Sequence, residues 1–229
     1  MKNNRRITLS SPTIKEHALS TDAPPEDSLF WKMWNASLEI AEAALATPFI
    51  QGIKNGTLDP VTYGAFNISD AYYCFHGADD YLTASNKATD KVLKAFLQKK
   101  HQSYQSYNET FPQTWRIKNA AGIVPTETCK AYSDFESTVA ADEMPIYMLI
   151  IMLPCEYLWG WLAGQLLPVK ANNLYAAWIN DNNSTKGAYA MGNFLCDYQK
   201  RHPIDEEKAM ELYTQAMHFE QQNFATATT

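Results

Sequence analysis

The sequence lacks the patterns that mark a disulfide-linked, secreted or nucleic-acid-binding protein. Its four cysteines, spread over 229 residues, include no CxxC pair, which favours reduced thiols over a disulfide framework. The basic opening MKNNRR is followed by polar residues and prolines rather than by the apolar core of a signal peptide. No run of lysine and arginine follows it, and the formal net charge is −6. We therefore expect a cytoplasmic protein that does not bind nucleic acid.

Short alternating runs of valine and isoleucine, typical of strands, are nearly absent. Long segments instead carry apolar residues at spacings of three and four, which predicts an all-α fold. Apolar residues make up 46% of the chain and charged residues 19%, enough to bury one core without a second domain. We expect residues 1–27 to form a flexible lead-in and residues 28–229 to form a single helical domain.

Start and stop signals divide this domain into helices. Asp59 followed by Pro60 is a strong start signal, with a carboxylate N-cap and a proline at the first helical position. Pro48 is expected to stop the first helix, and the segment PFIQGIKNGTL then reads as a loop with turns at Gly52 and Gly56. The expected helices cover roughly residues 28–47, 60 to beyond 81, 87–107, 126 onward, 144–167, 172–179, 187–200 and 205–225.

Residues 144–164 are almost uncharged and long enough to cross a bilayer. Pro154 and Glu156 lie near the middle of this stretch, where a carboxylate costs roughly 2 to 3 kcal/mol on insertion scales. The sequence holds no second such segment, and its mean hydropathy is −0.36. We therefore expect a buried central helix and no membrane span.

Cys155 has the most unusual surroundings of the four cysteines. Pro154 precedes it inside a strongly helical run, where proline removes a backbone hydrogen bond and clashes with an earlier carbonyl, at a cost of about 3 kcal/mol. Functional sites concentrate where a sequence breaks local rules in this way. A buried cysteine beside a tolerated kink is the competing interpretation. Cys74, Cys129 and Cys196 have ordinary surroundings and are expected to be packing residues.

Two carboxylates also lie among apolar neighbours. Asp70 shares a helical face with Tyr73 and Cys74, and a carboxylate on an aromatic face is expensive to bury without partners. Glu220 lies between Phe219 and Phe224 near the end of the chain. A partly exposed aspartate and a solvated glutamate are the alternatives. Histidines near acidic residues suggest a metal site only weakly, because the paired Glu-x-x-His motifs of di-iron bundles are absent.

Five segments, read in order, resemble a known family. PFIQGIKNGTL (48–58), SDAYY (69–73), LPCEYLWGWL (153–162), AAWIND (176–181) and FEQQNF (219–224) are similar to the PFVQGIxxGTL, QDxxY, LPCxWLY, KWIxxY and YExxFW motifs of the TenA (thiaminase II) family. They occur in that family's order and at about its spacing, over roughly residues 28–225. The resemblance implies a haem-oxygenase-like helical bundle without haem or metal, usually assembled as a homotetramer.

The resemblance also implies roles for individual residues. Cys155 would add as a nucleophile to the ring of an aminopyrimidine, and Glu220 would be the general acid for the departing amine. Asp70 would hold the amino group and ring nitrogen, while Tyr73 would line the site and hydrogen-bond near the thiol. Tyr132 would face the ring. The implied activity is hydrolysis of 4-amino-5-aminomethyl-2-methylpyrimidine, and of thiamin as a poorer substrate, to hydroxymethylpyrimidine in thiamin salvage.

The sequence departs from the family at several positions of the implied pocket. Trp159 and Asn182 stand where the family has tyrosines, yet both are still expected to contact substrate. Glu156 follows the cysteine where an aromatic residue is usual, and Asn223 with Phe224 replaces a Phe-Trp pair. These differences leave other functions open: hydrolysis of a related amine, a non-catalytic ligand-binding or regulatory protein on the same fold, or a helical metal-dependent oxidase.

Overall fold

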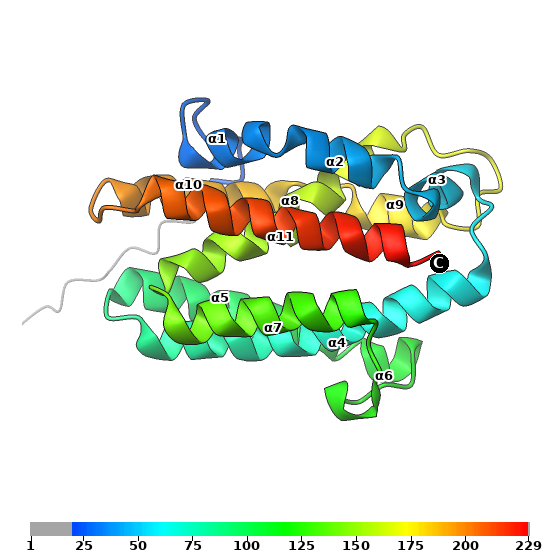
Figure 1. Cartoon of the computed structure of the whole chain (residues 1–229), viewed down its shortest axis with the longest axis horizontal. Helices are drawn as coiled ribbons and strands as arrows, with labels where there is room; N and C mark the ends of the chain where they lie inside the picture. The colour runs from blue at the N-terminus through cyan, green and yellow to red at the C-terminus, as the bar shows by residue number, and fades with distance from the viewer. Residues whose placement is uncertain (1–19, 229) are drawn as a thin grey trace, which may run out of the picture.

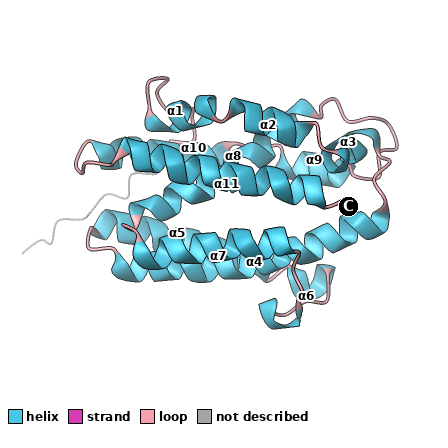
Figure 2. Cartoon of the chain, in the orientation of Figure 1, coloured by secondary structure: helices cyan, strands magenta, loops and turns pink. Residues whose placement is uncertain are grey.

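The computed structural model describes residues 20–228, and within that range the chain is built from helices joined by loops, with no strand (Figure 2). The predicted all-α class is confirmed. Residues 1–19, most of the predicted lead-in, lie outside the described residues. The α-helices are α1 (Leu29–Ala36), α2 (Leu38–Leu45), α3 (Pro48–Asn55), α4 (Pro60–Lys87), α5 (Lys91–Asn108), α6 (Phe111–Thr114), α7 (Glu127–Asp142), α8 (Ile146–Gln165), α9 (Ala176–Asn182), α10 (Lys186–Gln199) and α11 (Glu206–Thr226), and a short 3₁₀ turn covers Ala120–Gly122.

The long helices form two groups that run along the molecule (Figure 1). In one group α4 packs against α5 and α7, and in the other α11 packs against α1, α2 and α8. Helix α8 also contacts α4, α7, α9 and α10, so it joins the two groups. Side chains that point inward from α4, α7, α8 and α11 therefore meet in the middle of the bundle.

Helix α8 is the centre of the hydrophobic core. Every residue from Ile146 to Pro154 is buried. By length and composition alone this helix could cross a membrane, but 78% of its most apolar window is buried inside the fold. The predicted buried central helix is confirmed, and it runs through Pro154 without interruption.

The N-terminal region differs from its prediction at two points. The expected first helix is broken at Ser37 into α1 and α2. Pro48 begins a helix as well as ending the one before, because a proline at the first helical position lacks only an N–H that would have no partner there. Residues 48–55 are therefore helical and not a loop. The predicted turn at Gly56 is confirmed, since its φ of +70° is a conformation that favours glycine.

The N-cap signals in the sequence mark helix starts correctly. The Asp59 side chain accepts a hydrogen bond from the N–H of Thr62, and Thr126 caps α7 in the same way. Helix α4 is longer than expected, so Lys87 ends this helix and does not begin the next. Asp90 caps α5 instead.

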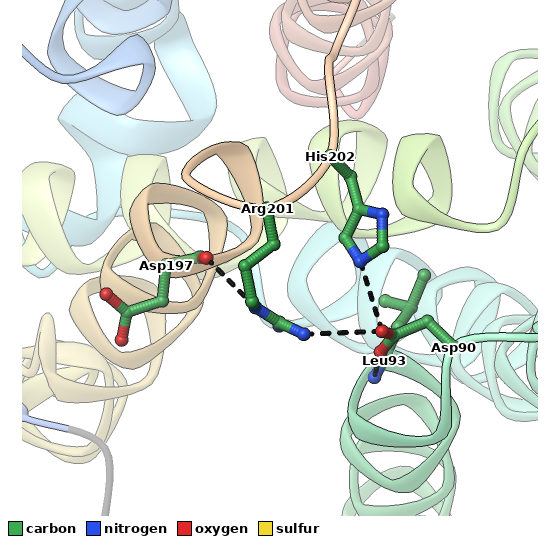
Figure 3. A network of polar contacts seen from close by, with 5 residues as sticks. All are labelled: Asp90, Leu93, Asp197, Arg201 and His202. Carbon is green, nitrogen blue, oxygen red and sulfur yellow. Dashed lines mark hydrogen bonds and ion pairs between the residues drawn. The ribbon is translucent and has the colours of Figure 1, made fainter.

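Two sets of hydrogen bonds join segments that are far apart in the sequence. Part of the predicted lead-in, residues 20–27, packs on α10, where the Asn193 side chain donates to the carbonyls of Ser20 and Asp22. Asp90 accepts hydrogen bonds from Arg201 and His202 in the loop between α10 and α11, at 3.3 and 3.1 Å (Figure 3). The α4–α5 turn is thereby joined to the α10–α11 loop of the second helix group, at the same end of the bundle (Figure 1).

Candidate functional site

Four helices supply the residues that the sequence singles out. Asp70 and Tyr73 come from α4, Tyr132 from α7, Cys155 and Trp159 from α8, and Glu220 from α11. These helices pack against one another in the centre of the bundle. Glu220 contacts Trp159 and Tyr132, and the Tyr132 ring packs against Tyr73. Asp70 and Cys155 interact with Glu220 through charge.

Glu220 is 3% exposed and is held from two sides. The indole Nε1 of Trp159 donates to its Oε2 at 3.0 Å, and the hydroxyl of Tyr132 donates to its Oε1 at 3.3 Å. Burial raises the pKa of Glu220 to about 8, an effect that these hydrogen bonds reduce and the nearby charge of Asp70 increases. This carboxyl group can therefore give up and regain a proton near neutral pH.

Cys155 is partly buried, and its Sγ lies 3.7 Å from the hydroxyl of Tyr104 on α5. Burial raises the pKa of the thiol well above its ordinary value, and the charges of Glu220, Glu156 and Asp70 raise it further. The contact with Tyr104 acts in the opposite direction. The thiol is thus protonated in the free protein, and a nucleophilic role requires a base to take its proton.

Sequence analysis did not identify Tyr104. It lies on α5 more than fifty residues before Cys155, and no local pattern marks it as different from a packing residue. Gly77 on α4 makes room for its ring, because a Cβ at Gly77 would lie 3.2 Å from Tyr104 Cε1. Glu156, the departure beside Cys155, forms an ion pair with Lys100 that is largely shielded from solvent.

Asp70 lines a cavity of about 200 Å³ between α4, α7 and the end of α11. Burial raises its pKa to about 7, and a contact of 3.9 Å with Cys74 Sγ reduces this rise. The cavity lining takes in Asp70 but neither Cys155 nor Glu220. The charge of Asp70 nevertheless acts on both groups, so the three predicted catalytic residues share one electrostatic environment. Their opening into a common pocket stays a prediction.

Tyr73, predicted to line the site and to hydrogen-bond near the thiol, makes its hydrogen bonds to Glu136 and Met152. Its hydroxyl is hydrogen-bonded at 2.8 Å to Oε1 of Glu136, a fully buried glutamate on α7. The reason is geometric: the hydroxyl meets α7, while Tyr104 reaches the sulfur from α5. Sequence analysis also missed Glu136, although a signal existed. It shares a helical face with Cys129, Tyr132 and Val139, at spacings of seven, four and three residues, and a carboxyl on such an apolar face is unusual.

Trp159 and Asn182 have different surroundings. The Trp159 ring packs against the rings of Trp178 and Phe224, at 5.6 and 5.4 Å between centroids, and its N–H holds Glu220. Asn182 donates to the Trp178 carbonyl of its own helix. The structure therefore brings Trp159 together with Glu220. Asn182 contacts Trp178 of its own helix, and the Trp178 ring packs against Trp159.

Residues that could bind a metal do not gather in this region. Among residues 20–228, no group of three or more histidine, cysteine, aspartate or glutamate side chains is arranged to hold a metal ion. Cys129 donates to the carbonyl of Ser69, and burial raises its pKa to about 12. This contact and the burial of Cys129 agree with the packing role predicted for it.

No protein-family model and no curated protein matches the sequence. Solved structures do match. A TenA homologue from P. horikoshii superimposes with a TM-score of 0.77 at 18% identity, over 87% of this chain and 98% of its own.

Two further structures are similar. A protein described as a TenA family transcription regulator from Silicibacter sp. has a TM-score of 0.70 at 16% identity, over 90% of this chain and 98% of its own. A putative TenA-like thiaminase from Sulfolobus solfataricus has a TM-score of 0.66 at 15% identity, over 86% of this chain and 95% of its own. The chain therefore has the TenA fold that its sequence motifs predict.

Proposed function

We propose that this chain is a TenA-type hydrolase that cleaves the exocyclic C–N bond of 4-amino-5-aminomethyl-2-methylpyrimidine. The observation that carries the proposal is the pairing of a cysteine, Cys155, with a buried acid, Glu220, whose pKa of about 8 lies near the working pH. An acid–base group works best when its pKa lies in this range. The TenA fold and the ordered motifs agree with this chemistry.

The reaction needs one proton that moves twice. The Glu220 carboxylate takes the proton of Cys155 while the sulfur forms a bond to the pyrimidine ring. The C–N bond then breaks, and Glu220 returns the proton to the departing amine. Water adds to the exocyclic methylene, the S–C bond breaks, and the proton from water restores the thiol. The products are ammonia and hydroxymethylpyrimidine, and every step uses side chains of this chain.

Asp70 has the right chemistry to hold an aminopyrimidine. A carboxyl group can accept from the exocyclic amino group and, when protonated, donate to the adjacent ring nitrogen. The Asp70 pKa of about 7 allows both forms near neutral pH. Its position on the wall of the cavity beside Phe66 supports this role, because an aromatic ring beside paired polar atoms suits a flat heterocycle.

The decisive experiment separates binding from turnover. Cys155→Ser should bind hydroxymethylpyrimidine with nearly unchanged affinity in equilibrium dialysis, yet release no product from the aminomethyl substrate, because an alcohol is far less ionised than a thiol. Cys196→Ser, at a partly exposed cysteine on α10, is the matched control and should keep full activity. Circular dichroism shows whether both variants fold. A Cys155→Ser protein that keeps most of its activity would contradict the covalent mechanism.

Two observations favour a second function. The thiol pKa is raised well above its ordinary value, as in a cysteine that only packs, and one structural neighbour is described as a transcription regulator. A non-catalytic pyrimidine-binding protein would bind the product and show no turnover in the wild-type chain. The same two assays therefore distinguish the two functions.

A further inference from the structure

Glu136 is a buried acid that the reaction above does not use. Its side chain is fully buried, its Oε1 meets the Tyr73 hydroxyl at 2.8 Å, and its Oε2 has no hydrogen-bond partner. A buried polar atom without a partner is costly, so such a group calls for an explanation.

Among residues 20–228, the groups that act on Glu136 do not include a cation that could stabilise a carboxylate. The titratable groups that face it are neutral hydroxyls and thiols or further acids: Tyr73, Cys74, Asp80 and Tyr81 on α4, Cys129 and Tyr132 on α7, and Glu220 on α11. Burial raises the pKa of Glu136 well above its ordinary value, and the charges of Asp80 and Glu220 add to the rise. Burial and the neighbouring acids therefore favour the protonated, neutral form of Glu136.

A neutral carboxylic acid has one O–H to place. On Oε2 this O–H would lack an acceptor, whereas on Oε1 it points at the Tyr73 oxygen. The hydroxyl of Tyr73 then accepts from Glu136, and its own proton is free to donate onward. Tyr132 is the next group: its ring lies 4.9 Å from that of Tyr73, and its side chain is close enough to those of both Tyr73 and Glu136 to interact with them. Tyr132 in turn donates to Glu220 at 3.3 Å.

We propose that Glu136 is a positioning residue for Glu220: its acid proton orients the Tyr73 hydroxyl toward Tyr132, and so keeps the Tyr132 hydroxyl donating to the Glu220 carboxylate. The inference rests on the proposed function, in which Glu220 must first act as a base. A donor fixed at the far end of a hydroxyl chain keeps the last hydroxyl turned toward Glu220. An ionised Glu136 would reverse the chain and turn Tyr73 away.

Two substitutions of Glu136 in the full chain separate this role from simple packing. Glu136→Gln keeps a donor, because the amide N–H can face Tyr73 while the amide oxygen takes the position of Oε2, the atom without a hydrogen-bond partner. Glu136→Met has similar length and no donor. We expect Gln to keep kcat within about threefold, whereas Met should lose about tenfold or more in kcat with KM unchanged. A packing role alone would not separate kcat from KM in this way.

The protonation of Glu220 gives a readout that needs no activity. Carbon-13 NMR of chain labelled at the glutamate carboxyl carbons, with Glu220→Gln for assignment, follows the Glu220 titration directly. Loss of one hydrogen bond to the carboxylate should raise its midpoint by about 0.5 to 1 pH unit in Glu136→Met. The midpoint should not move in Glu136→Gln. Asp134→Asn, at an exposed acid on the same helix that pairs with Lys130, is the control and should also leave it unchanged.

Tyr73→Phe removes the next hydroxyl between Glu136 and Glu220. It provides a second test of the inference if Glu136→Met does not fold. It should raise the Glu220 midpoint by a similar amount, and the double variant should raise it no further. An unchanged Glu220 midpoint in Glu136→Met or Tyr73→Phe would overturn the inference, as would a Glu136→Gln protein as impaired as Glu136→Met. A wild-type chain without turnover would instead contradict the proposed function, and the NMR titration would still decide the role of Glu136.

Discussion

Replacing Glu220 by glutamine should make the protein more stable while it removes the activity. The folded state raises the Glu220 pKa from 4.5 to about 8, so the folded protein holds this proton more tightly than the unfolded chain does. For a carboxyl of this kind, the stability that is present below pH 4.5 is lost as the pH rises toward 8. Glutamine is neutral at every pH and carries no such cost.

The expected size follows from the shift in pKa. Each pH unit between the unfolded and folded pKa values is equivalent to about 1.4 kcal/mol. At pH 7 the unfolded glutamate has passed its pKa of 4.5 by about 2.5 units, so Glu220→Gln should stabilise the fold by about 3 kcal/mol. The two hydrogen bonds survive, because the amide oxygen can accept from Trp159 while the amide N–H donates to the Tyr132 oxygen.

Urea unfolding of both proteins from pH 4 to pH 9, followed by circular dichroism, measures this effect. The gain in unfolding free energy should be near zero at pH 4, grow between pH 5 and pH 8, and level off above that. Turnover should fall by roughly 10² to 10⁴ at the same time, since the proton donor is gone. A stability difference that does not change with pH would refute the assignment of Glu220 as a buried acid.

Two further predictions concern Tyr104 and Asp90. Tyr104→Phe removes the hydroxyl beside the Cys155 sulfur, so the thiol pKa should rise. Alkylation by iodoacetamide at fixed pH should then slow about fivefold, as expected for the loss of one hydrogen bond of about 1 kcal/mol. An unchanged alkylation rate would count against this contact. Asp90→Ala removes a helix cap and both contacts to the α10–α11 loop, and should lower the free energy of unfolding in urea by about 2 kcal/mol. Asp205→Ala removes a cap alone and should lower it by less. Equal losses would show that the loop contacts add nothing to stability.

Local signals in the sequence predict much of the fold. The caps at Asp59, Thr126 and Asp205 lie next to the helices they begin, so they can be recognised without tertiary information. The break at Ser37 has no such marker. The sequence does not show that a helix begins at Pro48, because proline is compatible with both the end of one helix and the first position of the next.

The site is harder to predict because its partners are distant in sequence. Glu220 meets Tyr132 and Trp159 across 88 and 61 residues, and Tyr73 meets Glu136 across 63. Family motifs pointed to the first three residues, while Glu136 and its contact with Tyr73 come from helix packing alone. The unusual carboxyl on the apolar face of α7 could have suggested Glu136 as a candidate, but not which residue it holds.

Trp159 and Asn182, two of the departures from the family motifs, have different consequences for the site. Trp159 replaces a tyrosine hydroxyl, which can donate or accept, by an indole N–H that can only donate. Oε2 of Glu220 therefore always faces a donor, and the Tyr132 hydroxyl gives Oε1 a donor as well. Two donors favour the carboxylate and so lower a pKa that burial alone would raise further. Asn182 makes no comparable contact, since its amide is used within α9. The tryptophan thus keeps Glu220 suited to proton transfer, and the asparagine removes a ring from α9.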